Sequence, residues 1–173
     1  MGELRIRPGI LSPVNVAGAA LAVVLTAAAC ASLGPAVDQR TTQGPQAEAM
    51  WTYRVALANG REPTFEERLH WQRQLDLAIG RYLAKDQEFA SSPGVSTFRF
   101  VRQTAVGMSK EQVTILLGAP ERQTTDAGEI ETLAGKFWPD VKPHANEAWV
   151  YPGGWRLYFS GSRLVDITQH QPR

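Results

Sequence analysis

The chain has 173 residues, of which 43% are hydrophobic and 20% charged, and a formal net charge of +1. This is the composition of one globular domain with short appendages, which excludes a second large domain. Removal of residues 1–29 takes away Arg5, Arg7 and Glu3 and leaves no net charge. We therefore expect no nucleic-acid partner, because phosphate binding requires an excess of basic side chains.

Residues 1–29 have the pattern of a lipoprotein signal peptide: two arginines, an apolar run from Val16 to Ala29, and small residues before Cys30. The apolar run is shorter than the ~20 residues that a membrane-spanning helix needs. Residues 25–30 resemble the lipobox of bacterial lipoproteins, in which the cysteine is acylated and becomes the N-terminus. Cys30 is the only cysteine, so the chain cannot form an internal disulfide.

This resemblance implies a lipid anchor at Cys30 and a place in the bacterial cell envelope. Ala31 follows the cysteine where an aspartate would retain a lipoprotein at the inner membrane, so we expect the outer membrane, with the domain facing the periplasm. Two alternatives remain open: an uncleaved anchor, and cleavage by the ordinary signal peptidase to give a soluble periplasmic form.

Residues 30–49 contain few large apolar side chains and two Gly-Pro pairs, so we expect the lipidated cysteine to be followed by a disordered tether. Residues 50–92 are expected to form a helical extension. Met50–Arg61 suits a strand or a helix, and its alanines favour the helix. Thr64–Phe89 is predicted to be one long amphipathic helix, which begins with a Thr64–Glu67 capping box.

The apolar face of this long helix includes Trp71. Such a face lies either on the core of its own domain or in the groove of a partner, and the sequence leaves both possibilities open.

Residues 107–120 predict a short helix with both ends specified. Ser109 is the N-cap, Gln112 completes a capping box, Gly118 ends the helix, and Pro120 prevents its continuation. A helix this short is unstable alone, so we expect it to pack against a sheet.

Three strand-length runs follow at residues 147–151, 155–160 and 163–168. They are separated by Pro152-Gly-Gly154 and by Gly161-Ser162, which are typical of tight hairpin turns. The sequence therefore predicts an antiparallel meander of three strands.

Residues 97–169 resemble the SmpA/OmlA (BamE-like) family of bacterial envelope lipoproteins. The resemblance rests on Gly-Met-Ser-Lys-Glu-Gln-Val from Gly107, Leu-Leu-Gly-Ala-Pro from Leu116, and the apolar strand segments 149–151, 157–159 and 163–165, in the family's order. It implies two helices on a three-stranded antiparallel sheet within residues 93–173. Val95–Ala105 would be the first helix, and residues 121–146 would be an insertion.

The expected fold class is therefore α+β, with short helices packed on a three-stranded sheet and preceded by a long amphipathic helix and a lipid tether. Glycines and prolines in the insertion predict turns, and Glu129–Leu133 is expected to begin a strand.

No strong catalytic or metal-binding motif occurs. Glu67-x-x-His70 has the spacing of half a di-iron site, but the second half is missing, so a solvated helix face explains it better. A periplasmic hydrolase that uses Asp140, His144 or Glu147 is a remote alternative, because no activated nucleophile is recognisable. We expect no cofactor, no metal and no small-molecule substrate.

Four aromatic residues are candidate partner contacts: Trp138 and Phe137 in the insertion, Trp155 beside a hairpin turn, and Trp71 in the long helix. The family resemblance implies a non-enzymatic accessory subunit that binds other envelope proteins, with β-barrel assembly subunits as the preferred partners. The alternative is a subunit of a different envelope machine, which would dock through the long helix and the insertion.

Overall fold

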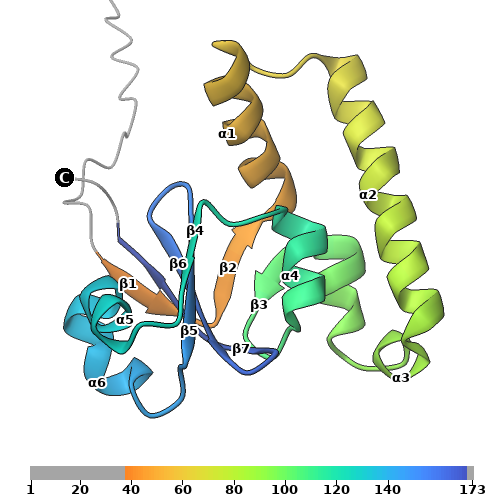
Figure 1. Ribbon diagram of the computed structural model, residues 1–173. Helices are drawn as coiled ribbons and strands as arrows, with labels where there is room; N and C mark the ends of the chain where they lie inside the picture. The colour runs from red at the N-terminus through yellow and green to blue at the C-terminus, as the bar shows by residue number, and fades with distance from the viewer. Residues whose placement is uncertain (1–37, 171–173) are drawn as a thin grey trace, which may run out of the picture. The chain divides into compact units, whose positions relative to one another are not determined.

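The computed structural model of the protein describes residues 38–170, and its architecture is mixed α+β (Figure 1). The candidate lipidation site Cys30 and the signal peptide lie outside the described residues. The elements, in chain order, are β1 (Gln39–Thr41), β2 (Gln43–Gln46), α1 (Ala47–Asn59), α2 (Phe65–Lys85), α3 (Gln87–Ala90), the π-helical turn η1 (Thr97–Val101), β3 (Gln103–Ala105), α4 (Lys110–Leu117), β4 (Arg122–Thr124), α5 (Ala127–Ala134), the 3-10 turn η2 (Gly135–Phe137), α6 (Trp138–Val141), β5 (Glu147–Tyr151), β6 (Trp155–Ser160) and β7 (Arg163–Gln169).

The main sheet is antiparallel and has five strands in the order β1-β7-β6-β5-β4. Its three central strands are the predicted meander, but the prediction of a three-stranded sheet is wrong, because β1 and β4 are added at the two edges. In β1, Arg40 is paired with Thr168 of β7. In β4, Gln123 is paired with Trp149 of β5.

The predicted disordered tether at residues 30–49 is wrong from Gln39 onward. Residues 39–41 satisfy their backbone groups by pairing with β7, and β2 pairs with β3 in a second, two-stranded sheet. Gly44 permits this close pairing, since a Cβ atom there would lie 2.3 Å from Thr104 Oγ1. The Gly-Pro segment that suggested a tether is therefore part of a tightly packed strand.

The two long helices are part of the core. The predicted capping box between Thr64 and Glu67 is present at the start of α2, which ends at Lys85 instead of continuing to Phe89. One hydrophobic cluster joins the helices to the sheet; it includes Met50 of α1, Leu75, Ile79, Tyr82 and Leu83 of α2, Val113, Leu116 and Leu117 of α4, and Trp149, Tyr151, Leu157, Phe159, Leu164 and Ile167 of the sheet. The boundary expected between a helical extension and a domain at residues 92 and 93 is therefore wrong.

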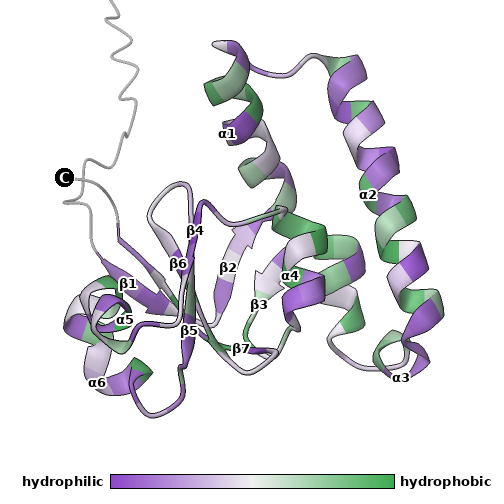
Figure 2. Cartoon of the chain, viewed as in Figure 1, coloured by the Kyte–Doolittle hydropathy of each residue, from purple (hydrophilic) through white to green (hydrophobic). Residues whose placement is uncertain are grey.

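Hydrophobic and hydrophilic segments recur along the ribbon of α2, as expected for an amphipathic helix (Figure 2). Its buried side chains recur at helical spacing at Leu75, Ile79, Tyr82 and Leu83. The open question about α2 is therefore answered for its buried face, which lies on the core of its own domain.

One further prediction is wrong in part and another is wrong. Val95–Ala105, expected to be the first helix of the pair, is helical only as far as Val101, in η1, and its last residues form β3 instead. Glu129–Leu133 is not a strand but lies within α5, which Asp126 caps by accepting a hydrogen bond from the Glu129 backbone N–H. The predicted helix at 110–117 is confirmed as α4, with its Ser109–Gln112 capping box.

Helices cover both faces of the main sheet. Figure 1 shows α1, α2 and α4 on one side and α5 with α6 on the other. The second side has a smaller hydrophobic cluster formed by Ile130, Leu133, Ala134, Val141, Ala148 and Tyr158. The register of β6 and β7 shifts between Tyr158 and Phe159, so that Leu164 and Ile167 both reach the main cluster although they are three residues apart.

Candidate functional site

The helical hairpin of α1 and α2, here called the arm, has large exposed apolar side chains on both helices, and Phe100 and Val101 of η1 are also exposed. Leu57 near the end of α1 and Phe65 at the start of α2 are 66% and 72% exposed, and Tyr53 is 47% exposed. Large apolar side chains that gather on an exposed surface often mark an interaction site. The arm is therefore the main candidate for a protein-binding surface.

Contacts nearer the core fix the arm in place. Trp51 of α1 and Trp71 of α2 are stacked, with ring centroids 4.8 Å apart and an interplanar angle of 12°. Glu48 forms an ion pair with Arg68 of α2. Trp71, predicted as a partner contact, thus has an intramolecular role, since its ring packs on Trp51 and the main cluster.

Trp155, another predicted contact, borders a small apolar crevice between α1 and the β5–β6 turn. The crevice has a volume of about 140 Å³ and is lined by Pro45, Ala49, Met50, Tyr53, Pro152, Gly153 and Trp155. It holds no ionisable side chain other than the Tyr53 phenol. An apolar side chain of a partner fits this chemistry better than a charged ligand does.

The other two predicted contacts, Phe137 and Trp138, are not in an extended loop. They belong to η2 and α6 and are half-buried against the smaller cluster. The premise that this apolar pair lacks a structural role is therefore wrong. Lys136 lies 5.0 Å from the centroid of the Phe137 ring, and Lys142 lies 6.0 Å from that of Trp138. Residues 127–142, here called the cap, thus present two aromatic rings beside two lysines.

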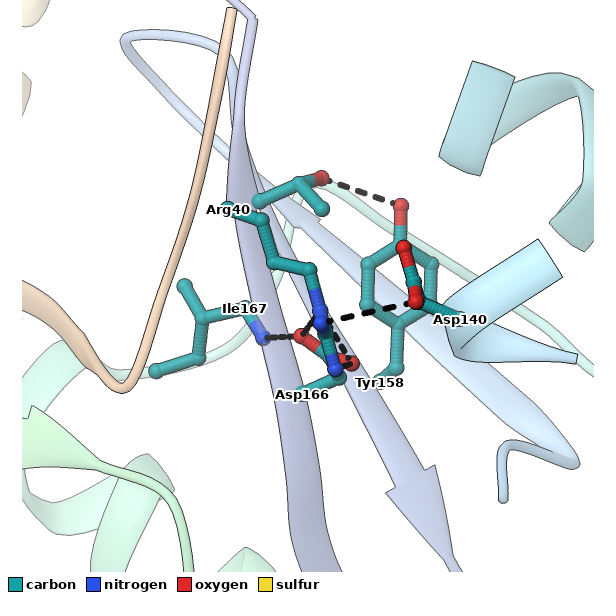
Figure 3. A network of polar contacts seen from close by, with 6 residues as sticks. Arg40, Asp140, Tyr158, Asp166 and Ile167 are labelled. Carbon is teal, nitrogen blue, oxygen red and sulfur yellow. Dashed lines mark hydrogen bonds and ion pairs between the residues drawn. The ribbon is translucent and has the colours of Figure 1, made fainter. Parts of the chain in front are cut away.

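A polar network connects the cap to β1 and β7 (Figure 3). The Arg40 guanidinium donates hydrogen bonds to both carboxylate oxygens of Asp166, at 3.0 and 2.9 Å, and lies 3.8 Å from the carboxylate of Asp140 in the cap. These contacts raise the pKa of Arg40. The Asp166 side chain is only 6% exposed and also accepts from the backbone N–H of Ile167.

Two buried side chains complete the network. The Tyr158 hydroxyl lies 3.1 Å from Thr168 Oγ1. Burial raises the pKa of Tyr158 to about 12, so this phenol is neutral at physiological pH. The network attaches the edge strand β1 to the cap. None of its side chains is an exposed nucleophile.

His170 joins the start of β1 to the cap in a second place. Its Nδ1 atom lies 3.4 Å from the carboxylate of Asp38, and its ring packs edge-on against Phe137 with centroids 5.9 Å apart. Burial, together with the nearby Arg156, lowers the pKa of His170, while Asp38 opposes this effect.

The residues of the remote hydrolase alternative are not brought together. Glu147 accepts hydrogen bonds of 2.5 Å from Lys110 and from Trp149 Nε1, on the face covered by α4. Burial disfavours its ionisation, but these two bonds outweigh that effect and lower the pKa of Glu147. Asp140 lies in the cap on the opposite face, and His144 is exposed after α6. This arrangement does not resemble a catalytic constellation.

The possible di-iron half-site has another explanation. Glu67 is engaged by the capping box and by an ion pair of 2.8 Å with Arg61. Across residues 38–170, no group of three or more His, Cys, Asp or Glu side chains is placed to hold a metal ion.

Sequence reasoning missed Arg40, Asp166 and His170. The signal for Asp166 was available, because an acidic residue inside the apolar run Leu-Val-Asp-Ile requires a partner when it is buried. The identity of that partner was not available, since Arg40 is 126 positions away.

In the part of the chain that the structure describes, no helix is both long and apolar enough to cross a membrane. Comparison with protein-family models, with curated proteins and with solved structures finds no match to the chain.

Proposed function

We propose that this protein is a lipid-anchored, non-enzymatic binding subunit of the bacterial cell envelope, and that it contacts a partner protein through the arm. The observation that carries the proposal is the exposure of Leu57 and Phe65 on a helical hairpin whose base is fixed in the core. Exposed apolar side chains on a rigid element are typical of an interface, because binding then costs little ordering of the surface.

The anchor is the acylated Cys30, on the strength of the lipobox-like residues 25–30 and the short apolar run before them. Several acyl chains on one residue hold a protein stably at a membrane, whereas a single chain binds only marginally. In this proposal the protein acts at the outer membrane, on its periplasmic side, in outer-membrane protein assembly or envelope integrity. The SmpA/OmlA resemblance of residues 97–169 supports this role.

A second candidate is a subunit of a different envelope machine. The observation that favours it is that the arm precedes residue 97 and so lies outside the segment that resembles the family. A partner bound through the arm would then differ from the β-barrel assembly subunits.

Copurification tests the proposal and separates the two candidates. The tagged protein is extracted in mild detergent and compared with Leu57→Ser and Phe65→Ser variants. The matched control is Glu66→Ser, since Glu66 is an exposed residue of the same helix turn. We expect both apolar variants to copurify at least tenfold less of a specific partner protein, whereas the Glu66→Ser control copurifies as much of it as the wild type does.

If the partner that depends on Leu57 and Phe65 is a β-barrel assembly subunit, the result supports a role in outer-membrane protein assembly. If it is another envelope protein, the result supports a subunit of a different envelope machine. Equal recovery of all partners by Leu57→Ser, Phe65→Ser and Glu66→Ser would contradict a binding role for the arm.

A further inference from the structure

The position of β1 limits how far the domain can stand from a lipid anchor. Only residues 31–38 separate Cys30 from β1, which starts at Gln39 and pairs with β7. Eight residues span at most about 28 Å when fully extended. Since the 21-residue helix α2 is itself about 32 Å long, the tether is shorter than one dimension of the domain.

The chain enters the domain beside the cap. Asp38 contacts His170, and His170 contacts Phe137 of the cap. Two residues after Asp38, in β1, Arg40 forms an ion pair with Asp140, which also belongs to the cap (Figure 3). Of the surfaces described above, the cap is thus the one directly connected to the point at which a tether from Cys30 arrives.

The cap also has the chemistry of a surface that lies at a lipid headgroup layer. Phe137 and Trp138 are half-buried aromatic rings whose remaining surface is open to solvent, and Lys136 and Lys142 are exposed beside them. The amphipathic ring of tryptophan favours the boundary between hydrocarbon and water, and the apolar ring of phenylalanine favours the hydrocarbon side of it. Lysines keep their charge in the headgroup layer while their methylene stems cover apolar surface.

We infer that the cap is a membrane-contacting surface, in which Phe137 and Trp138 lie against phospholipid headgroups and Lys136 and Lys142 contact the lipid phosphates. This inference rests on the proposed acylation of Cys30. It also orients the molecule, because the cap and the arm lie on opposite faces of the sheet (Figure 1). With the cap at the lipid, the arm points away from it and is open to a partner.

The test uses the full-length acylated protein in vesicles of phosphatidylethanolamine and phosphatidylglycerol. A fluorescent label is attached to a second cysteine, introduced as Lys136→Cys in the cap or as Leu57→Cys in the arm, which is the matched control. Both positions are exposed, so neither substitution removes a core contact. Acylation consumes the thiol of Cys30, so that each variant has one reactive cysteine.

Quenching by a nitroxide on the lipid headgroup is compared with quenching by aqueous iodide. We expect the label at position 136 to be quenched at least twofold more by the lipid nitroxide than the label at position 57, and to be shielded from iodide. Lys142→Glu should reduce the lipid quenching at position 136, whereas Arg73→Glu on the exposed side of α2 should not.

Equal iodide quenching of the two labels on an acylated protein would overturn the inference alone. Shielding of position 136 in native membranes but not in pure lipid vesicles would also overturn it, because a protein would then cover the cap. A mass spectrum that shows no acyl chain on Cys30 would overturn the proposed anchor together with this inference, so the two failures are distinguishable.

Discussion

The guanidinium of Arg40, in the first strand, is held by two hydrogen bonds to the carboxylate of Asp166, in the last strand. The two residues are 126 positions apart, and their contact attaches the edge strand to the sheet. Because the Asp166 side chain is only 6% exposed, its charge depends on Arg40 and on the Ile167 backbone N–H for compensation.

Loss of Arg40 is therefore expected to destabilise the fold. Arg40→Ala should lower the free energy of unfolding by about 1–2 kcal/mol, because it removes the charged donor of the buried Asp166 carboxylate. The loss is not larger because solvent reaches the half-exposed position of Arg40 and can hydrate the carboxylate. Arg73→Ala, at an exposed position of α2, should change stability by less than about 0.5 kcal/mol. Urea denaturation of both variants checks this, and equal midpoints would contradict a stabilising role for the pair.

The two glycines of the β5–β6 turn differ in what surrounds them. Both have φ of +74°, but only at Gly154 would a Cβ atom meet backbone, 1.7 Å from the carbonyl oxygen of His170. Gly153→Ala is expected to cost about 1–2 kcal/mol from the left-handed conformation alone. Gly154→Ala should cost about 1–3 kcal/mol more, because the end of β7 must move. Thermal unfolding of the two variants measures the difference, and equal losses would show that the close approach to His170 is unimportant.

Acid stability should depend on Glu67. The hydrogen bond from Arg61, followed by that from the Thr64 backbone, lowers the pKa of Glu67 from 4.5 to about 2. A lowered pKa means that the folded state favours the charged form. Its stabilising effect is fully present above pH 4.5 and is lost as the pH falls toward about 2.

Melting temperatures measured across this pH range test the role of Glu67. The wild type should lose more stability toward low pH than Glu67→Gln does, whereas Glu66→Gln, one residue earlier on the same exposed turn, should follow the wild type. Parallel curves for the wild type and Glu67→Gln would exclude a specific role for the capping box in acid stability.

His170 should produce a pH dependence at milder acidity. Burial, the largest effect, and Arg156 lower the pKa of His170 below 6.5 in the fold. Below pH 6.5 the unfolded chain binds a proton that the folded protein does not, so stability falls until the folded pKa is reached. His170→Gln should remove this decline in denaturation experiments between pH 7 and pH 5, and His144→Gln, at an exposed position, should retain it. A decline that persists in His170→Gln must originate elsewhere.

The parts of the fold that the sequence predicted correctly are those specified by local patterns. The caps of α4 and the turns of the β5–β6–β7 meander depend on residues within a few positions of one another. The start of α2 at Thr64 belongs to the same class.

The edge strand β1 could not be predicted in this way. It consists of three polar residues that become a strand only because β7, far along the chain, offers a free edge. The helix α5 is different, because Ile130, Leu133 and Ala134 have helical spacing and Asp126 is a good N-cap. That signal was available, but the surrounding glycines and prolines obscured it.

The candidate site was predicted only in part. Phe137 and Trp138 were singled out in the sequence, but as a loop, whereas they pack on the smaller cluster beside Lys136 and Lys142. Leu57 and Phe65 were not singled out, because helical spacing of apolar residues does not reveal which of them lie beyond the core and are exposed. Their exposure follows from the way in which the arm extends past the packed part of the core.

Mass spectrometry of the N-terminus of the protein purified from membranes tests the central claim most directly. The account predicts a mature chain that begins at Cys30 and carries acyl chains, and a Cys30→Ala variant that is no longer processed in this way and does not partition into the membrane as an acylated species. A chain that begins at Met1, or one that begins at Cys30 without an acyl group, would contradict the proposal of a lipid-anchored subunit.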